Sequence, residues 1–121
     1  MRLSPVSIFW AAEPDLAERA AAEQSRTTHA APAAVDACRV YARLLVRAIA
    51  GEPKQELLKP WPDTADLDPA VAAVMAGSWR GKKRGQIQSS GYVVHSLEAA
   101  LWAVDQAEDF RGAVLAAANL G

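Results

Sequence analysis

The chain has 121 residues, with 13 basic and 14 acidic side chains and a formal net charge of −1. This length suits one domain, which we expect to span residues 1–121. The nearly balanced charge excludes a chain-wide attraction to nucleic acid or to an anionic membrane surface. No apolar run approaches the ~20 residues of a membrane-spanning helix, so we expect no membrane partner. The single cysteine excludes an internal disulfide and fits a cytoplasmic location.

Half of the residues are hydrophobic, but 27 of them are alanines. Because alanine buries little area, we predict a core dense in helices and poor in large side chains. Residues 91–94 are the only short β-prone patch, and no useful period-two pattern occurs elsewhere. The predicted fold class is therefore all-α.

A proline opens each of the first two predicted helices. Pro14 opens a helix over residues 15–26, and Pro32 opens a second that ends at Gly51. On the second helix, apolar residues recur at steps of three and four and predict a buried stripe: Val35, Cys38, Ala42, Leu45, Val46 and Ile49. The opposite, solvated stripe is predicted to contain Asp36, Arg39, Arg43 and Arg47.

Shorter elements follow. We predict a short helix over 53–58, and a helix that Asp68 caps, Pro69 opens and Gly77 ends. Residues 78–90 contain two glycines and four basic side chains, and their composition favours a mobile, solvated loop.

The last two predicted helices lie near the end of the sequence. A helical pattern resumes at Tyr92, and Asp109 caps a final helix. The apolar stripe predicted on that final helix contains Phe110, Ala113, Val114 and Ala117.

The acidic residues are scattered rather than clustered. Asp66 and Asp68 have the spacing of an Asp-x-Asp pair, but Asp68 precedes Pro69 and suits a helix cap better than a metal site. We therefore predict no catalytic residue and no metal ligand in this chain.

Two short segments are candidates for ligand binding. His29 lies between two predicted helices, where it could contact phosphate or ribose oxygens or simply face solvent. Gly91 permits close approach to the backbone, and Tyr92 beside Ser90 offers a flat ring and a hydroxyl. The alternative is that Tyr92 is a core tyrosine and contacts no ligand. His95, early in a helix, is interpreted as an ordinary surface or first-turn residue.

Three segments resemble the ADP-ribosylglycohydrolase family of the dinitrogenase-reductase-activating type. The most specific is Ser-Ser-Gly-Tyr-Val-Val-His-Ser-Leu-Glu-Ala-Ala-Leu-Trp-Ala at residues 89–103, together with Asn-Leu-Gly at 119–121. Met-Arg-Leu-Ser-Pro at residues 1–5 resembles the end of the family's glycine-rich segment, in which Arg2 would keep a structural role. Thr28-His29 resembles a Thr/Ser-His that lines the family's ADP-ribose cleft.

The resemblance implies an orthogonal helical bundle, a C-terminal-half portion of the family fold. It implies Mg²⁺-dependent removal of ADP-ribose from modified protein side chains, with His29, Ser90, Gly91 and Tyr92 in the substrate cleft. In the family, Asn-x-Gly precedes Gly-Asp-x-Asp-Thr, whose carboxylates hold the metals. The sequence stops at Gly121, so we expect this chain alone to bind no Mg²⁺ and to be inactive.

The second hypothesis is a non-catalytic helical module that binds a protein partner or an ADP-ribosyl nucleotide. Apolar faces of an incomplete domain would favour self-association or a complementary fragment. A third hypothesis is nucleic-acid binding by the basic segment, but that segment lacks interleaved aromatic residues, so nucleic acid is not an expected partner.

Overall fold

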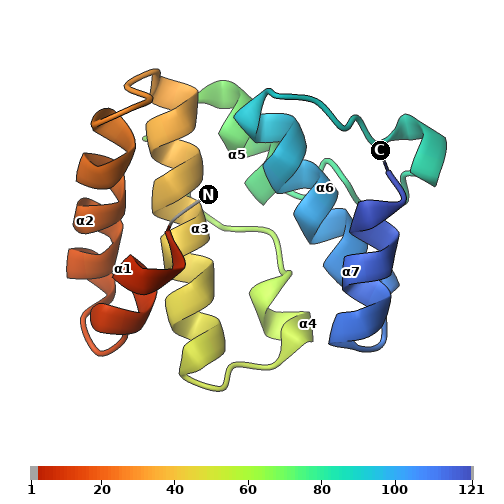
Figure 1. The fold of residues 1–121 in the computed structure, drawn as a ribbon, viewed down its shortest axis with the longest axis horizontal. Coiled ribbons are helices and arrows are strands. Elements are labelled where there is room, and N and C mark those ends of the chain that lie inside the picture. The colour runs from red at the N-terminus through yellow and green to blue at the C-terminus, as the bar shows by residue number, and fades with distance from the viewer. Residues whose placement is uncertain (1–2, 121) are drawn as a thin grey trace.

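The computed structural model describes residues 3–120, which form helices and loops without a strand. The predicted all-α class is confirmed (Figure 1). The helices are α1 (Ser4–Phe9), α2 (Pro14–Arg26), α3 (Pro32–Ile49), α4 (Lys54–Leu57), α5 (Pro69–Met75), α6 (Val93–Gln106) and α7 (Phe110–Ala118), with a 3₁₀ turn at Arg84–Gln86. The predicted roles of Met1, Arg2 and Gly121 lie outside the described residues.

Local sequence signals determine where the helices start and stop. A proline occupies the first turn of α1, α2, α3 and α5. The Asp68 carboxylate accepts the backbone N–H of Ala70 at 2.9 Å and caps α5. Gly51, at φ 85°, ends α3 in a left-handed conformation that glycine tolerates best. The boundaries predicted at Pro14, Pro32, Gly51, Asp68 and Pro69 are confirmed, whereas α1 was not predicted.

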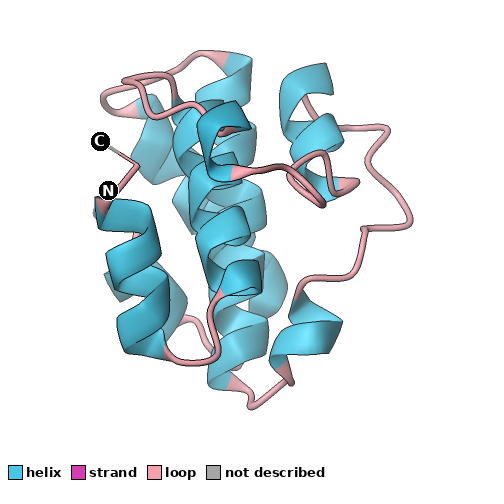
Figure 2. Cartoon of the chain, turned by 90° about the vertical axis from the view of Figure 1, so that its right-hand side faces the viewer, coloured by secondary structure: helices cyan, strands magenta, loops and turns pink. Residues whose placement is uncertain are grey.

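Helix α3 is the centre of the bundle. Helices α1 and α2 pack on one side of it, and α4, α5 and α6 pack on the other (Figure 1). Helix α7 packs against α6. The view in Figure 2 shows the long loops that connect the shorter helices around this centre. Within residues 3–120, no helix combines the length and apolarity needed to cross a membrane.

The largest buried side chains lie between α3, α5 and α6. Trp79 is 2% exposed and packs in one cluster with Val40, Val71 and Trp102. A smaller cluster joins Leu3, Ala21 and Ala42 on the other side of α3. The prediction of a core poor in large side chains therefore fits the smaller cluster but not the main one, which contains two tryptophans.

Two predicted stripes are partly wrong. On α3, Ile49 is exposed and Asp36 is buried, because neighbours on both sides of this central helix leave little solvated surface. On α7, Phe110 and Val114 are exposed, whereas Ala116 packs against the core. Periodicity located the apolar residues on these helices but did not determine which ones a neighbour covers.

Candidate functional site

Ser90, Tyr92 and His95 form a compact group at the start of α6, here called the Ser90 cluster. The Ser90 Oγ is 2.7 Å from Nδ1 of His95 and accepts the backbone N–H of Tyr92 at 3.1 Å. The Tyr92 and His95 ring centroids are 5.1 Å apart, with the planes at 89°. The prediction that His95 is a first-turn residue is confirmed, but it is half-buried and contacts both neighbours, which was not predicted.

The exposed parts of this segment are suited to ligand contact. Tyr92 is 45% exposed, so it is not a core tyrosine, and part of its surface is open. No atom would lie within 4 Å of a side chain built at Gly91. A ligand can therefore approach both the backbone of Gly91 and the side chain of Tyr92.

His29 lies in the turn between α2 and α3. Its Nδ1 is 2.9 Å from Oγ1 of Thr28, and its backbone carbonyl accepts the Ser25 hydroxyl at 2.9 Å. This turn and the start of α6 both lie at the upper end of the bundle in Figure 1. Ser90, Gly91 and Tyr92 are consecutive, and exposed His29 lies at the same end of the bundle. Among the described residues, His29 makes no hydrogen bond or ring contact to them.

Glu98 fixes the preceding loop to α6. Its Oε1 accepts the Ser78 hydroxyl and the Lys82 ammonium, each at 2.7 Å. Burial opposes ionisation of Glu98, but the hydrogen bonds from Lys82 and Ser78 outweigh it and hold the pKa of the carboxyl below its usual range. The Trp102 ring N–H also donates to the Lys82 carbonyl at 2.9 Å.

Other basic residues of this loop are anchored as well. The Arg80 guanidinium lies 4.7 Å from the Trp79 ring centroid and donates to the Leu58 carbonyl. Arg84 donates to the Asn119 carbonyl at the end of α7. The predicted solvated character is confirmed for Arg80 and Arg84, which are exposed, although the fold also engages their cationic groups. The predicted mobility of this loop stays a prediction.

Three carboxylates converge on the guanidinium of one arginine. Arg39 contacts Glu18 at 2.9 Å, Asp36 at 3.0 Å and Asp66 at 2.8 Å. The hydrogen bond from Arg39 lowers the pKa of Asp66, and Asp36 also accepts the Asp68 backbone N–H at 2.8 Å. Residues 3–120 contain no group of three or more His, Cys, Asp or Glu that could hold a metal ion. These donors do not fit the metal pair that the resemblance implies.

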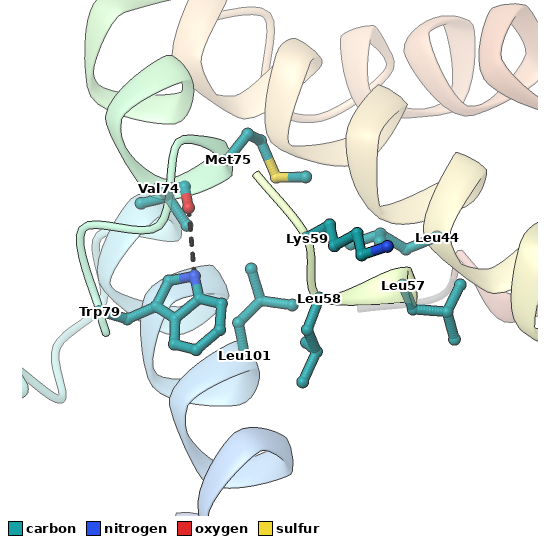
Figure 3. A pocket seen from close by; sticks show the side chains of 8 residues that line it. All are labelled: Leu44, Leu57, Leu58, Lys59, Val74, Met75, Trp79 and Leu101. Carbon is teal, nitrogen blue, oxygen red and sulfur yellow. Dashed lines mark hydrogen bonds between the residues drawn. The ribbon is translucent and has the colours of Figure 1, made fainter. Parts of the chain in front are cut away.

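Neither of two hollows formed by residues 3–120 is lined by His29 or the Ser90 cluster. One, of about 10 Å³, has room for roughly one water and lies under Trp79, whose ring N–H donates to the Val74 carbonyl (Figure 3). The other is an open groove of about 570 Å³ between α2 and α3, lined mainly by charged side chains. The Ser90 cluster lines neither of these hollows, and its Ser90 and Tyr92 are exposed.

Comparison with known proteins gives a consistent result. The model of the ADP-ribosylglycohydrolase family matches residues 1–121. The chain is 42% identical over 120 residues to ADP-ribosylarginine hydrolase Tri1 of Pseudomonas putida (strain GB-1), covering 99% of this chain and 32% of that relative. It is 36% identical over 121 residues to Tri1 of Serratia proteamaculans (strain 568), covering 100% of this chain and 32% of that relative. The chain thus spans about a third of the length of these curated relatives.

Proposed function

This chain belongs to the ADP-ribosylglycohydrolase family, and from that premise we propose that it contributes ADP-ribose-binding residues to an ADP-ribosylarginine hydrolase. The observation that carries the proposal is the Ser90 cluster beside the open backbone of Gly91. Two relatives named ADP-ribosylarginine hydrolase support arginine as the modified side chain.

The proposed residues bind the substrate rather than cleave it. The half-exposed Tyr92 ring offers a flat surface on which a base or a ribose can stack. Gly91 permits close approach, and Ser90 offers a hydroxyl oxygen. His29 would contact the same ligand from the turn between α2 and α3.

Cleavage requires groups that the described residues do not assemble. In a complete hydrolase of this family, Mg²⁺ would stabilise developing charge and activate water. Residues 3–120 offer no cluster of ligands for such an ion, so we assign them no step that involves it. We propose that the chain is inactive alone and, given its single cysteine, acts in the cytoplasm.

A chimera tests the proposed binding role. The matched third of the Pseudomonas putida hydrolase is replaced by this chain, and release of ADP-ribose from ADP-ribosylated arginine is measured. Tyr92→Ala should lower kcat/KM about tenfold, because loss of one stacking contact costs about 1–3 kcal/mol. Tyr41→Ala, at an exposed tyrosine on α3, is the matched control. Equal kcat/KM in the two variants would contradict the proposal.

A protein-binding module is the second candidate function, favoured by exposed apolar residues. Phe9 on α1 is 77% exposed and Phe110 on α7 is 85% exposed, with Ile8, Val114 and Leu115 beside them in sequence or on the same helix. Both helices lie toward the viewer in Figure 1. Such surfaces favour a complementary part of the hydrolase or a second copy of the chain. Scattering at increasing concentration separates these partners, since only self-association raises the mass of the isolated chain.

A further inference from the structure

His95 contacts both side chains of the proposed ligand-binding segment. Its Nδ1 meets the Ser90 Oγ at 2.7 Å, and its ring meets the Tyr92 ring edge-on at 5.1 Å. Edge-to-face contacts of this kind are a preferred arrangement of aromatic rings. One residue therefore restrains both the orientation of the Tyr92 ring and the hydrogen bonding of Ser90.

The hydrogen bonds around Ser90 favour one direction. The backbone N–H of Tyr92 donates to the Ser90 Oγ at 3.1 Å. If the Ser90 hydroxyl then donates to Nδ1 of His95, the two bonds run head to tail and each polarises the other. If Nδ1 carried the proton, two donors would converge on the same oxygen and this reinforcement would be lost. The first arrangement places the imidazole proton on Nε2.

We infer that His95 is a positioning residue that leaves the Ser90 hydroxyl only an accepting lone pair for a ligand, so that Ser90 binds a ribose hydroxyl rather than a phosphate oxygen. A serine hydroxyl has one proton and two lone pairs. With the imidazole proton on Nε2, His95 accepts the Ser90 proton, and the Tyr92 N–H occupies one lone pair. The remaining lone pair can accept a hydrogen bond from a ribose hydroxyl but not from an ionised phosphate oxygen.

The surrounding charges agree with this selectivity. Glu98, one helical turn beyond His95, is paired with Lys82, so the charge of this lysine is already neutralised. The inference rests on the proposed function, because it specifies which part of ADP-ribose the Ser90 cluster contacts.

Two substitutions separate the contacts of His95. His95→Asn keeps an acceptor close to the position of Nδ1 but removes the ring, whereas His95→Phe keeps a ring and removes the acceptor. Ser96→Ala, at an exposed serine in the same turn of α6, is the matched control. Each variant of the full chain is titrated with millimolar ADP-ribose and, separately, with inorganic phosphate, and the NMR signals of the backbone amides of residues 90–92 are followed. Nitrogen NMR of the imidazole identifies the tautomer.

The expected result has three parts. In the unsubstituted chain, His95 carries its proton on Nε2, and ADP-ribose but not phosphate shifts the amide signals. His95→Phe weakens ADP-ribose binding about three- to tenfold, the effect of one neutral hydrogen bond, and allows a response to phosphate. His95→Asn restores the preference for ADP-ribose over phosphate.

Contrary results are distinguishable. A proton on Nδ1, or equal ADP-ribose affinity in His95→Phe and Ser96→Ala, overturns the role of His95 while the proposed binding function stands. No response of the unsubstituted chain to ADP-ribose overturns that function, and this inference with it.

Discussion

The two sides of α3 are held together in different ways. Toward α2, the buried residues are small, chiefly Ala17, Ala21 and Ala22, and Arg39 links α3 to Glu18 through an ion pair. Toward α5 and α6, the buried residues are large and include Trp79, Met75, Leu97 and Trp102. Alanines allow close approach but bury little area, so charged contacts hold the first side in register, whereas apolar area stabilises the second.

This difference predicts unequal responses to substitution. Truncation on the α5–α6 side removes buried apolar area and should have the largest effect. Loss of a charge on the α2–α3 side should have a smaller effect that depends on salt, because part of the network is exposed to solvent.

The largest expected effect is that of Trp79→Ala. This substitution leaves a cavity under α5 and removes the donor to the Val74 carbonyl, so it should lower the free energy of unfolding by about 3–5 kcal/mol. Denaturation in urea measures this change. Trp10→Ala, at a half-buried tryptophan that follows α1, is the control and should have a clearly smaller effect. Similar losses of unfolding free energy in the two variants would contradict the unequal roles of the two sides of α3.

Arg39→Met should have the next largest effect. It keeps much of the apolar stem but leaves Asp36, which is buried, without its cationic partner. We expect a loss of about 1–3 kcal/mol, below that of a fully buried pair because Arg39 is partly exposed. The loss should shrink at about 1 M salt. Arg19→Met, at an exposed arginine of α2, is the control. A loss that does not depend on salt would contradict an ionic role.

Glu98→Gln should reduce stability in a pH-dependent way. The pKa of Glu98 lies below its ordinary value in the folded chain, so its charge stabilises the fold above the pKa of the unfolded chain, and this contribution disappears as the pH falls through the folded pKa. Near neutral pH we expect a loss of about 1–2 kcal/mol. The difference between the variant and the unsubstituted chain should shrink in acid, as urea denaturation at several pH values would show. Glu23→Gln, on an exposed face of α2, should show almost none of this dependence.

Phe110→Ser should have the smallest effect. The Phe110 side chain is 85% exposed, so its removal from the isolated chain should change the free energy of unfolding by less than about 0.5 kcal/mol. Thermal melting of the isolated chain measures this. A large loss of stability would show that α7 buries this ring against the bundle or against another copy.

The sequence was sufficient to predict the helix ends that depend on residues close together in the chain. Pro32 and Gly51 bound α3, and Asp68 and Asp109 cap helices through backbone N–H groups two and three residues away. These interactions need no knowledge of the tertiary fold. The fold class followed from them and from the helical periodicity.

Long-range contacts could not be predicted in this way. Arg39 and Asp66 are 27 residues apart, and Lys82 and Glu98 are 16 apart, so only the folded chain reveals these pairs. His95 was missed although Ser90 is five residues away, because its orientation depends on how the chain enters α6. The positions of Ser90, Gly91 and Tyr92 were suggested by family resemblance, and their role in binding stays a prediction.

The central claim is that this chain binds part of the substrate but does not assemble the metal site needed to cleave it. The most direct test is release of ADP-ribose from an arginine-modified protein by the isolated chain, with and without Mg²⁺. We predict no release above the protein-free blank in either condition. Sustained Mg²⁺-dependent turnover by these 121 residues alone would contradict the account.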